Sequence, residues 1–218
     1  MQAMTEPRVI DDDKLQAFAA TVMGDIAGAL TVLLGYVGDQ TGVYRSMAEQ
    51  GPATATTLAD KAGVDARYLL EWLSAQAAAG YVQYDRATET FSLTPEQAVV
   101  LSAEGHPACM QGMIQLLTAQ FTTHEKAVHT FRSGEGRAWG EHHACCFCGT
   151  DRFFRAGYNV NLLENWLPAL EGVESRLRAG GRVADIGCGL GSSTLLMARA
   201  FPNSSFDGFD IHPPSIEE

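Results

Sequence analysis

Basic residues are scarce in this chain of 218 residues, in which Lys and Arg total 15 against 26 Asp and Glu. The formal net charge is −11 at pH 7. Nucleic-acid binding needs a basic surface that neutralises phosphates, so this balance argues against a general DNA- or RNA-binding protein. Attraction to an anionic membrane surface depends on the same positive charge and is disfavoured for the same reason.

Long apolar runs are also missing. The longest one, Ile26 to Val37, contains glycines and a threonine and is shorter than the roughly 18 residues that a membrane span needs. Residues 1–14 contain no apolar segment typical of a secretory signal. Five cysteines without such a signal indicate reduced thiols. We therefore expect a soluble, cytoplasmic protein, which the 46% of hydrophobic residues also favours.

The strongest motif begins at Val183 to Ile186, a short apolar segment that predicts a buried parallel strand. Three glycines follow at alternate positions, where they allow a tight turn and a close approach of a ligand. These are Gly187, Gly189 and Gly191. Ser192 or Ser193 would then cap a helix over Thr194 to Ala200, whose first N–H groups would face the ligand.

A second strand is expected over Ser205 to Phe209, with Asp210 at its end, 19 residues after Gly191. A carboxylate at this place suits the two hydroxyls of a ribose. His212 could line an adenine site beside Ile211, and it could equally be a solvated histidine in the loop before two prolines. Cys188, between the glycines, is better explained as a small filler than as a nucleophile, because no nearby histidine would activate it.

The glycine spacing separates two classes of nucleotide cofactor. A dinucleotide site usually has G-x-G-x-x-G, whereas this chain has G-x-G-x-G directly after Asp185. The pattern resembles the first motif of class I S-adenosylmethionine-dependent methyltransferases. The resemblance implies that the glycine loop wraps the methionine part of the cofactor, that Asp185 helps to position its amino group, and that Asp210 binds the ribose. The implied cofactor-binding residues are Asp185, Gly187, Gly189, Gly191, Asp210 and Ile211.

Residues 54–93 have the order helix, turn, helix, hairpin, which is typical of a winged helix-turn-helix. DNA binding is the usual function of that motif, but residues 54–91 carry three basic and five acidic side chains. Residues 58–64, 70–73 and 78–82 resemble the winged-helix module with which many bacterial and plant small-molecule methyltransferases begin. The chain is most similar to an actinobacterial group of such enzymes, sometimes described as transcriptional regulators. The resemblance implies that the module serves dimerisation and substrate enclosure.

Helical spacing of apolar residues predicts three longer helices: residues 11–36, 112–131 and 151–179. The first is apolar on more than one side, so we expect it to pack against another chain or domain as well as against its own core. Apolar side chains of the second helix, 112–131, could belong to the core or also line a substrate pocket; they are Met113, Leu117 and Phe121. In the third helix, 151–179, we expect Phe154 and Tyr158 to pack against the sheet or touch the cofactor.

Residues 133–150 are glycine-rich and predict an irregular loop that covers a pocket. Two histidines and three cysteines in this segment could suggest zinc, but their spacing does not fit known zinc motifs, so we expect no metal. His142 or His143 could act as a general base for a hydroxyl substrate, because an imidazole titrates near neutral pH. A solvated loop histidine is the simpler interpretation, since methyl transfer often needs only proximity and desolvation.

These predictions define an α+β winged helix plus helical connector, followed by the first part of an α/β Rossmann-like domain. The expected divisions are residues 1–100 for the winged-helix dimerisation domain, 101–180 for the connector and covering loop, and 181–218 for the incomplete cofactor domain. The chain ends eight residues after Asp210, before the remaining strands that the resembled fold needs. We therefore expect it to be the amino-terminal part of a longer enzyme and inactive alone.

The expected function is S-adenosylmethionine-dependent methyl transfer to an oxygen, nitrogen or carbon atom of a small molecule by a homodimer. A ligand-sensing transcriptional regulator is one alternative, which a basic surface on the winged helix would favour. An inactive fragment that only dimerises is another. A nicotinamide-dependent enzyme is disfavoured by the glycine spacing.

Overall fold

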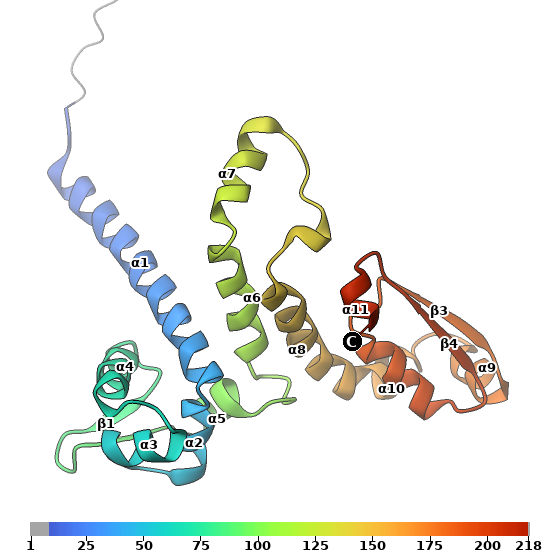
Figure 1. The fold of residues 1–218 in the computed structure, drawn as a ribbon, viewed down its shortest axis with the longest axis horizontal. Helices are drawn as coiled ribbons and strands as arrows, with labels where there is room; N and C mark the ends of the chain where they lie inside the picture. Colours follow the sequence, from blue (N-terminus) through green and yellow to red (C-terminus); the bar gives the residue numbers. More distant parts are fainter. Residues whose placement is uncertain (1–8, 218) are drawn as a thin grey trace, which may run out of the picture.

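The computed structural model describes residues 9–217. The molecule is elongated, with the winged-helix elements at one end, a pair of parallel strands at the other, and helices α6 and α8 between them (Figure 1). Residues 1–8, within the segment where we expect no secretory signal, lie outside the described residues.

Helix α1 (Asp12–Gln40) begins at the N-cap Asp11, whose carboxylate accepts a hydrogen bond from the backbone N–H of Lys14 at 3.2 Å. By length and composition alone this helix could cross a membrane, although the sequence predicts no apolar run long enough for a span. Its carboxyl-terminal part instead docks on the winged helix, where the Trp72 indole N–H donates to the Leu34 carbonyl at 2.8 Å. The opposite end of α1 projects away from the rest of the molecule (Figure 1).

The winged helix has the predicted order of elements. They are α2 (Val43–Gln50), α3 (Ala55–Ala62), α4 (Ala66–Ala78), β1 (Gln83–Asp85) and β2 (Thr90–Ser92). The N-caps Thr54 and Asp65 start α3 and α4 as their side chains accept first-turn N–H groups. Strands β1 and β2 are antiparallel, and Ala53 forms a bridge with Phe91 on the other side of β2.

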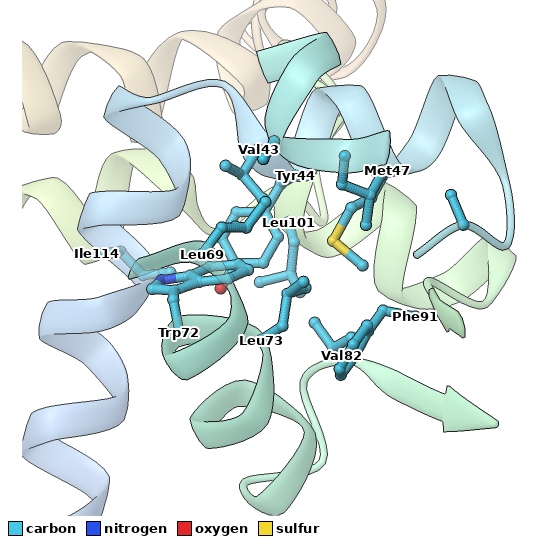
Figure 2. Packing of buried hydrophobic residues seen from close by; sticks show 13 residues of the cluster. Val43, Tyr44, Met47, Leu69, Trp72, Leu73, Val82, Phe91, Leu101 and Ile114 are labelled. Carbon is cyan, nitrogen blue, oxygen red and sulfur yellow. The ribbon is translucent and has the colours of Figure 1, made fainter. Parts of the chain in front are cut away.

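A hydrophobic core holds these elements together, and Figure 2 shows its side chains. Tyr44 and Trp72 meet edge to face with ring centroids 5.1 Å apart, at the centre of the cluster. The Tyr44 hydroxyl donates to the buried Gln76 side chain at 2.9 Å, which satisfies both polar groups. Burial is the main cause that raises the pKa of Tyr44, so the phenol stays neutral and able to donate.

The connector differs from the sequence prediction at two places. Its elements are α5 (Pro95–Ser102), α6 (Gln111–Phe121), α7 (His124–Ser133), the short 3-10 helix η1 (Trp139–Glu141) and α8 (Ala144–Asn161). The single helix predicted over 112–131 is wrong, because Thr122 and Thr123 interrupt it and their hydroxyls bond to carbonyls of the preceding turn. The predicted loop 133–150 is wrong from Ala144 onward, where α8 begins.

Helices α6 and α8 cross at two glycines. A Cβ atom added at Gly112 would lie 2.5 Å from the Phe153 backbone nitrogen, and one added at Gly149 would lie 2.7 Å from the Leu116 backbone nitrogen. The two backbones are therefore in direct contact. Only residues without a side chain permit this approach.

Arg152 of α8 joins the connector to the winged helix. Its guanidinium forms two hydrogen bonds with Asp39 of α1, at 2.8 and 3.2 Å, and two with Glu104, at 3.2 and 2.7 Å. Gln111 and Gln115 of α6 accept two more, at 3.2 and 2.7 Å. The Arg152 and Asp39 side chains are 18% and 8% exposed, so this is a largely buried ion pair with full hydrogen bonding.

Tyr36 provides a second link between α1 and α8. Its hydroxyl lies 3.4 Å from the Cys145 sulfur in the first turn of α8. This hydrogen bond, followed by burial, raises the pKa of Tyr36 to about 12, so the phenol is neutral at physiological pH.

The carboxyl-terminal unit contains the two predicted strands. Its elements are the π-helical turn η2 (Leu162–Trp166), α9 (Val173–Ala179), β3 (Arg182–Ile186), α10 (Ser192–Ala200), β4 (Ser205–Phe209) and α11 (Pro213–Glu217). The strands pair in parallel with Ile186 opposite Phe209, and α10 connects them. The continuous helix predicted over 151–179 is wrong, because α8 ends at Asn161 and α9 starts only at Val173.

Strand β3 is covered on one face only within the described residues. Val183 packs with Leu177, Met197 and Phe201 in a second, smaller core, whereas Ile186 is 77% exposed. The expectation of a buried strand therefore holds for one face of β3 only. Helices α9 and α10 supply the apolar partners of one face.

Candidate functional site

The glycine loop starts where β3 ends and turns back against β4. The backbone N–H groups of Gly187 and Cys188 both donate to the Phe209 carbonyl, at 2.7 and 3.1 Å. All three glycines of the motif have φ between 56° and 79°, a left-handed backbone that side chains disfavour. Gly191 is the N-cap of α10, so the prediction of a serine cap is wrong.

Asp210 closes the loop from the end of β4. One of its carboxylate oxygens accepts the Gly189 N–H at 2.9 Å, and the other accepts the His212 N–H at 2.9 Å. The carboxylate thus lies directly beside the glycine backbone, as the sequence motif predicts. Each oxygen has a second lone pair with which it can accept a ligand hydroxyl.

Asp185 binds the first turn of α10. Its Oδ2 accepts hydrogen bonds from the Ser193 hydroxyl at 2.9 Å and from the Thr194 hydroxyl at 2.6 Å. The serine and threonine that follow the glycines therefore hold an acid at the helix start instead of capping the helix. A carboxylate is electrostatically favourable at this end of a helix.

Two cavities flank the glycine loop. The smaller, of about 100 Å³, lies between the loop and α8 and is lined by Asp151, Phe154 and Tyr158, among others. The larger, of about 550 Å³, lies on the side of Asp210 and Ile211. Gly187 and Gly189 line both, as do Trp139 and Thr150. The loop backbone is thus accessible on two sides.

An aromatic group covers these cavities. Phe147 of α8 stacks on His212 with ring centroids 4.0 Å apart, and Trp139 of η1 meets Phe147 edge to face at 5.3 Å. His212 is therefore neither a freely solvated loop residue nor one of the residues that line the two cavities. Trp139 was not predicted as a site residue. A tryptophan in an otherwise glycine-rich segment was the only signal that could have indicated it.

The two predicted base candidates lie near this group. The His143 ring accepts the Cys145 N–H at 3.2 Å, so His143 is the N-cap of α8. His142 is half-buried with its ring 5.4 Å from that of Trp139. Burial, followed by the charge of Arg137, lowers the pKa of His142 and favours the neutral imidazole. Neither histidine is among the described residues that line the two cavities.

The cysteines do not form a metal site with these histidines. Within residues 9–217, no group of three His, Cys, Asp or Glu side chains is arranged to hold a metal ion. Cys146 is buried in the turn of α8 that faces α6, where the Gln120 amide lies 3.8 Å from its sulfur.

Cys188 fills the space inside the glycine turn. A Cβ atom added at Gly208 of β4 would lie 2.9 Å from the Cys188 sulfur, so the thiol occupies the gap that this glycine leaves. Burial, followed by the charges of Asp185 and Asp210, raises the pKa of the Cys188 thiol. A thiol with a raised pKa is a poor nucleophile, which favours the filler interpretation.

Residues 28–103 match the family model of the Rv2258c-like winged HTH domain. No curated protein sequence matches the chain. Among solved structures, the chain is similar to mitomycin 7-O-methyltransferase MmcR, with a TM-score of 0.60, 21% identity, and coverage of 95% of this chain and 62% of that one.

Two further solved structures share this fold. CalO1, a methyltransferase of calicheamicin biosynthesis in its SAH-bound form, has a TM-score of 0.58, 22% identity, and coverage of 93% and 60%. An O-methyltransferase family protein from Burkholderia thailandensis has a TM-score of 0.55, 15% identity, and coverage of 96% and 60%. The chain therefore spans about 60% of the length of these structures. It shares the fold of these structures over that length, with an amino-terminal winged helix, a helical connector and the first two strands of a Rossmann-like unit.

Proposed function

We propose that this chain belongs to an enzyme that transfers the methyl group of S-adenosylmethionine to a small-molecule acceptor. The observation that carries the proposal is the pairing of the Asp210 carboxylate with the Gly189 N–H beside two cavities. A cofactor with a ribose and no phosphate fits this site. It needs a carboxylate for its hydroxyls and bare backbone for close approach, whereas the loop offers no Lys or Arg for a phosphate.

The residues of the chain bind and orient the cofactor in this proposal. Asp210 accepts the ribose hydroxyls, Ile211 supplies an apolar wall for the base, and the glycine backbone follows the chain that leads to sulfur. Asp185 acts through Ser193 and Thr194 by fixing the start of α10. The bound cofactor supplies an electrophilic sulfonium methyl group, and Trp139 and Phe147 exclude water above it.

We propose His142 as the candidate proton acceptor for the acceptor hydroxyl. Its lowered pKa keeps the imidazole neutral near pH 7, the form that accepts a proton. Its contact with Trp139 places it at the border of the covering aromatic group. His143 shares the loop, but its ring is engaged in capping α8.

Titration calorimetry with S-adenosylhomocysteine tests the cofactor assignment. We expect the chain alone to bind it weakly if at all and a chain extended by the remaining strands of the fold to bind it. In the extended chain, Asp210→Ala is expected to bind about tenfold or more weakly, because two hydrogen bonds to a charged acceptor disappear. Asp207→Ala is the matched control, since Asp207 lies on β4, three residues before Asp210, and its side chain pairs with the exposed Arg182 at 3.4 Å. Equal affinities of the two variants, or no binding by the extended chain, would contradict the proposal.

We also propose that the chain forms a homodimer through α1. The projecting part of this helix exposes large apolar side chains along one stripe, and more lie on the projecting helix α7 and the end of α6. On α1 they are Leu15, Phe18, Val22, Met23, Ile26, Leu30, Leu33 and Val37; on α6 and α7 they are Leu117, Phe121, Val128 and Phe131. Apolar surface of this extent is typical of a protein interface. If the stripe on α1 of one copy packs against the apolar side chains of α6 and α7 of the other copy, and the reverse, both surfaces are buried.

The double change Leu30→Asp and Leu33→Asp is expected to give a monomer, because it places four charges in the two-fold interface. Light scattering after size-exclusion chromatography over a concentration series measures the mass. Ala17→Asp with Ala20→Asp adds the same charges to the opposite side of α1 and is expected to leave the dimer intact. A dimer that survives the leucine changes would remove α1 from the interface.

The winged helix serves this association, not DNA binding, in our proposal. The side chains on α4 that would face a groove include the acidic Glu71 beside Arg67, and the whole protein carries a net charge of −11. Salt-sensitive binding to random duplex DNA would support the regulator alternative instead. A cytoplasmic location follows from the same proposal, because the cofactor and reduced thiols belong to that compartment.

A further inference from the structure

We propose that Asp151 of α8 binds the ammonium group of the cofactor's amino-acid end and thereby selects ligands that carry it. This inference rests on the proposed function and goes beyond it, because the cofactor motif of the sequence does not include α8. It reassigns a contact that the motif gives to Asp185.

The smaller cavity lies between α8 and the glycine loop, and its carboxylate comes from α8. Asp151 is one of its lining residues, whereas Asp185 lines neither of the two cavities beside the loop. The Asp185 carboxylate is occupied by the Ser193 and Thr194 hydroxyls. An amino group that enters the smaller cavity therefore meets Asp151 as its carboxylate.

The environment of Asp151 favours a bound cation. Its side chain is 12% exposed and accepts a short hydrogen bond from the Ser192 hydroxyl, which fixes the carboxylate toward the start of α10. Arg155, one turn along α8, is the nearby cation, but its Nε lies 3.5 Å away and its side chain is 46% exposed. A largely buried carboxylate with one weak cationic partner gains from a second cation, which a ligand ammonium supplies.

The start of α10, beside Asp151, offers hydrogen-bond donors for the carboxylate of the same amino-acid end. The N-cap of α10 is Gly191, which offers no side-chain hydrogen bond to the first turn, and Ser192 of that turn lines the cavity. Backbone N–H groups at a helix start favour an anion. Burial, followed by the charges of Asp185 and Asp151, raises the pKa of Tyr158, so its phenol remains a donor. The cavity thus offers an acid for an ammonium and donors for a carboxylate, which matches a zwitterionic amino acid.

Two ligands separate this role from cofactor binding in general. S-adenosylhomocysteine carries the amino-acid end, whereas methylthioadenosine has the same adenosine and sulfur without it. We expect Asp151→Asn, which keeps the shape and removes the charge, to weaken S-adenosylhomocysteine binding about tenfold and to leave methylthioadenosine binding unchanged. Asp210→Ala is expected to weaken both ligands, because it acts at the ribose.

Each other outcome is decisive. Equal loss of both ligands in Asp151→Asn would show that Asp151 only supports the fold of the site, and unchanged binding of both would show that it does not contact the ligand. Arg155→Gln is the matched control for the neighbouring ion pair; if it reproduces the loss of S-adenosylhomocysteine alone, Arg155 and not Asp151 reads the amino-acid end. These measurements use the chain extended by the remaining strands of the fold, and failure of that extended chain, without substitutions, to bind either ligand would overturn the proposed function itself.

Discussion

Gly149→Ala is expected to destabilise the protein by about 3 kcal/mol, the upper end of the usual cost of an added methyl group in a packed interior. The new Cβ would lie 2.7 Å from the Leu116 backbone nitrogen and 2.8 Å from the Gly112 carbonyl oxygen. Both are backbone atoms of α6, which can move only if the whole helix moves. Urea denaturation followed by circular dichroism measures the change in the free energy of unfolding.

Gly157→Ala is the matched control on the same helix. Apart from its chain neighbours and the backbone of its own helix, no atom of the described residues lies within 4 Å of the Cβ that it adds, and the residue is inside α8. Replacing a helical glycine by alanine at an open position stabilises by about 0.5–1 kcal/mol. Opposite signs for the two variants are therefore expected. A neutral Gly149→Ala would mean that α6 and α8 do not cross as closely as the structure shows.

Arg152→Met is expected to cost about 3 kcal/mol, because it leaves the carboxylate of Asp39 buried without a cation. The charge of Asp39 cannot be hydrated there, since its side chain is only 8% exposed. The midpoint of denaturation is the measurement. Arg155→Met, which removes the exposed arginine one turn further along α8, is expected to change stability by less than about 0.5 kcal/mol.

A second variant separates the charge from the packing. Arg152→Met combined with Asp39→Leu replaces the buried pair by apolar groups, and the half-exposed Glu104 and the side-chain oxygens of Gln111 and Gln115 lose their hydrogen bonds from Arg152. Such replacements are often neutral, so the double variant is expected to recover most of the lost stability. If the double variant loses more free energy of unfolding than the two single variants lose together, Arg152 stabilises the protein by packing against its neighbours more than by neutralising Asp39.

The elements governed by local chemistry could be predicted from the sequence. The order helix, turn, helix, hairpin follows from local signals such as the caps Thr54 and Asp65, and the glycine motif fixes the turn between β3 and α10. The position of Asp210 beside this loop followed from the parallel pairing of two strands across one helix. These features depend on neighbours that are close in the sequence.

The connector could not be predicted in the same way. The histidines and cysteines of 142–148 looked like reactive groups in a loop, whereas α8 starts at Ala144 because the His143 ring caps it. The apolar spacing of 112–131 continued across Thr122 and concealed the break there. Gly112 and Gly149 acquire their function only because α6 meets α8, and no local signal indicates that contact.

The candidate site shows the same division. The loop and Asp210 carry a motif, but Trp139 and Asp151 reach the cavities from segments more than 30 residues earlier in the chain. Ser192 and Ser193 were predicted as caps, and their hydroxyls instead hold Asp151 and Asp185. A hydroxyl can satisfy either a backbone or a side-chain partner, and only the tertiary structure decides between them.

The bond between Asp39 and Arg152 also has a consequence for synthesis, because 113 residues separate its partners. At the roughly 5–20 residues per second of a ribosome, Asp39 waits about 6–23 s for Arg152 to be made. The winged helix has its own core and can fold during this interval, with Trp72 already holding Leu34. The apolar stripe of α1 meanwhile emerges uncovered. Helix α8 does not cover this stripe, which stays exposed in the folded structure. What its synthesis adds is the cation that the buried Asp39 carboxylate lacks until then, so the junction of α1 with the winged helix reaches its full stability only after Arg152 has been made.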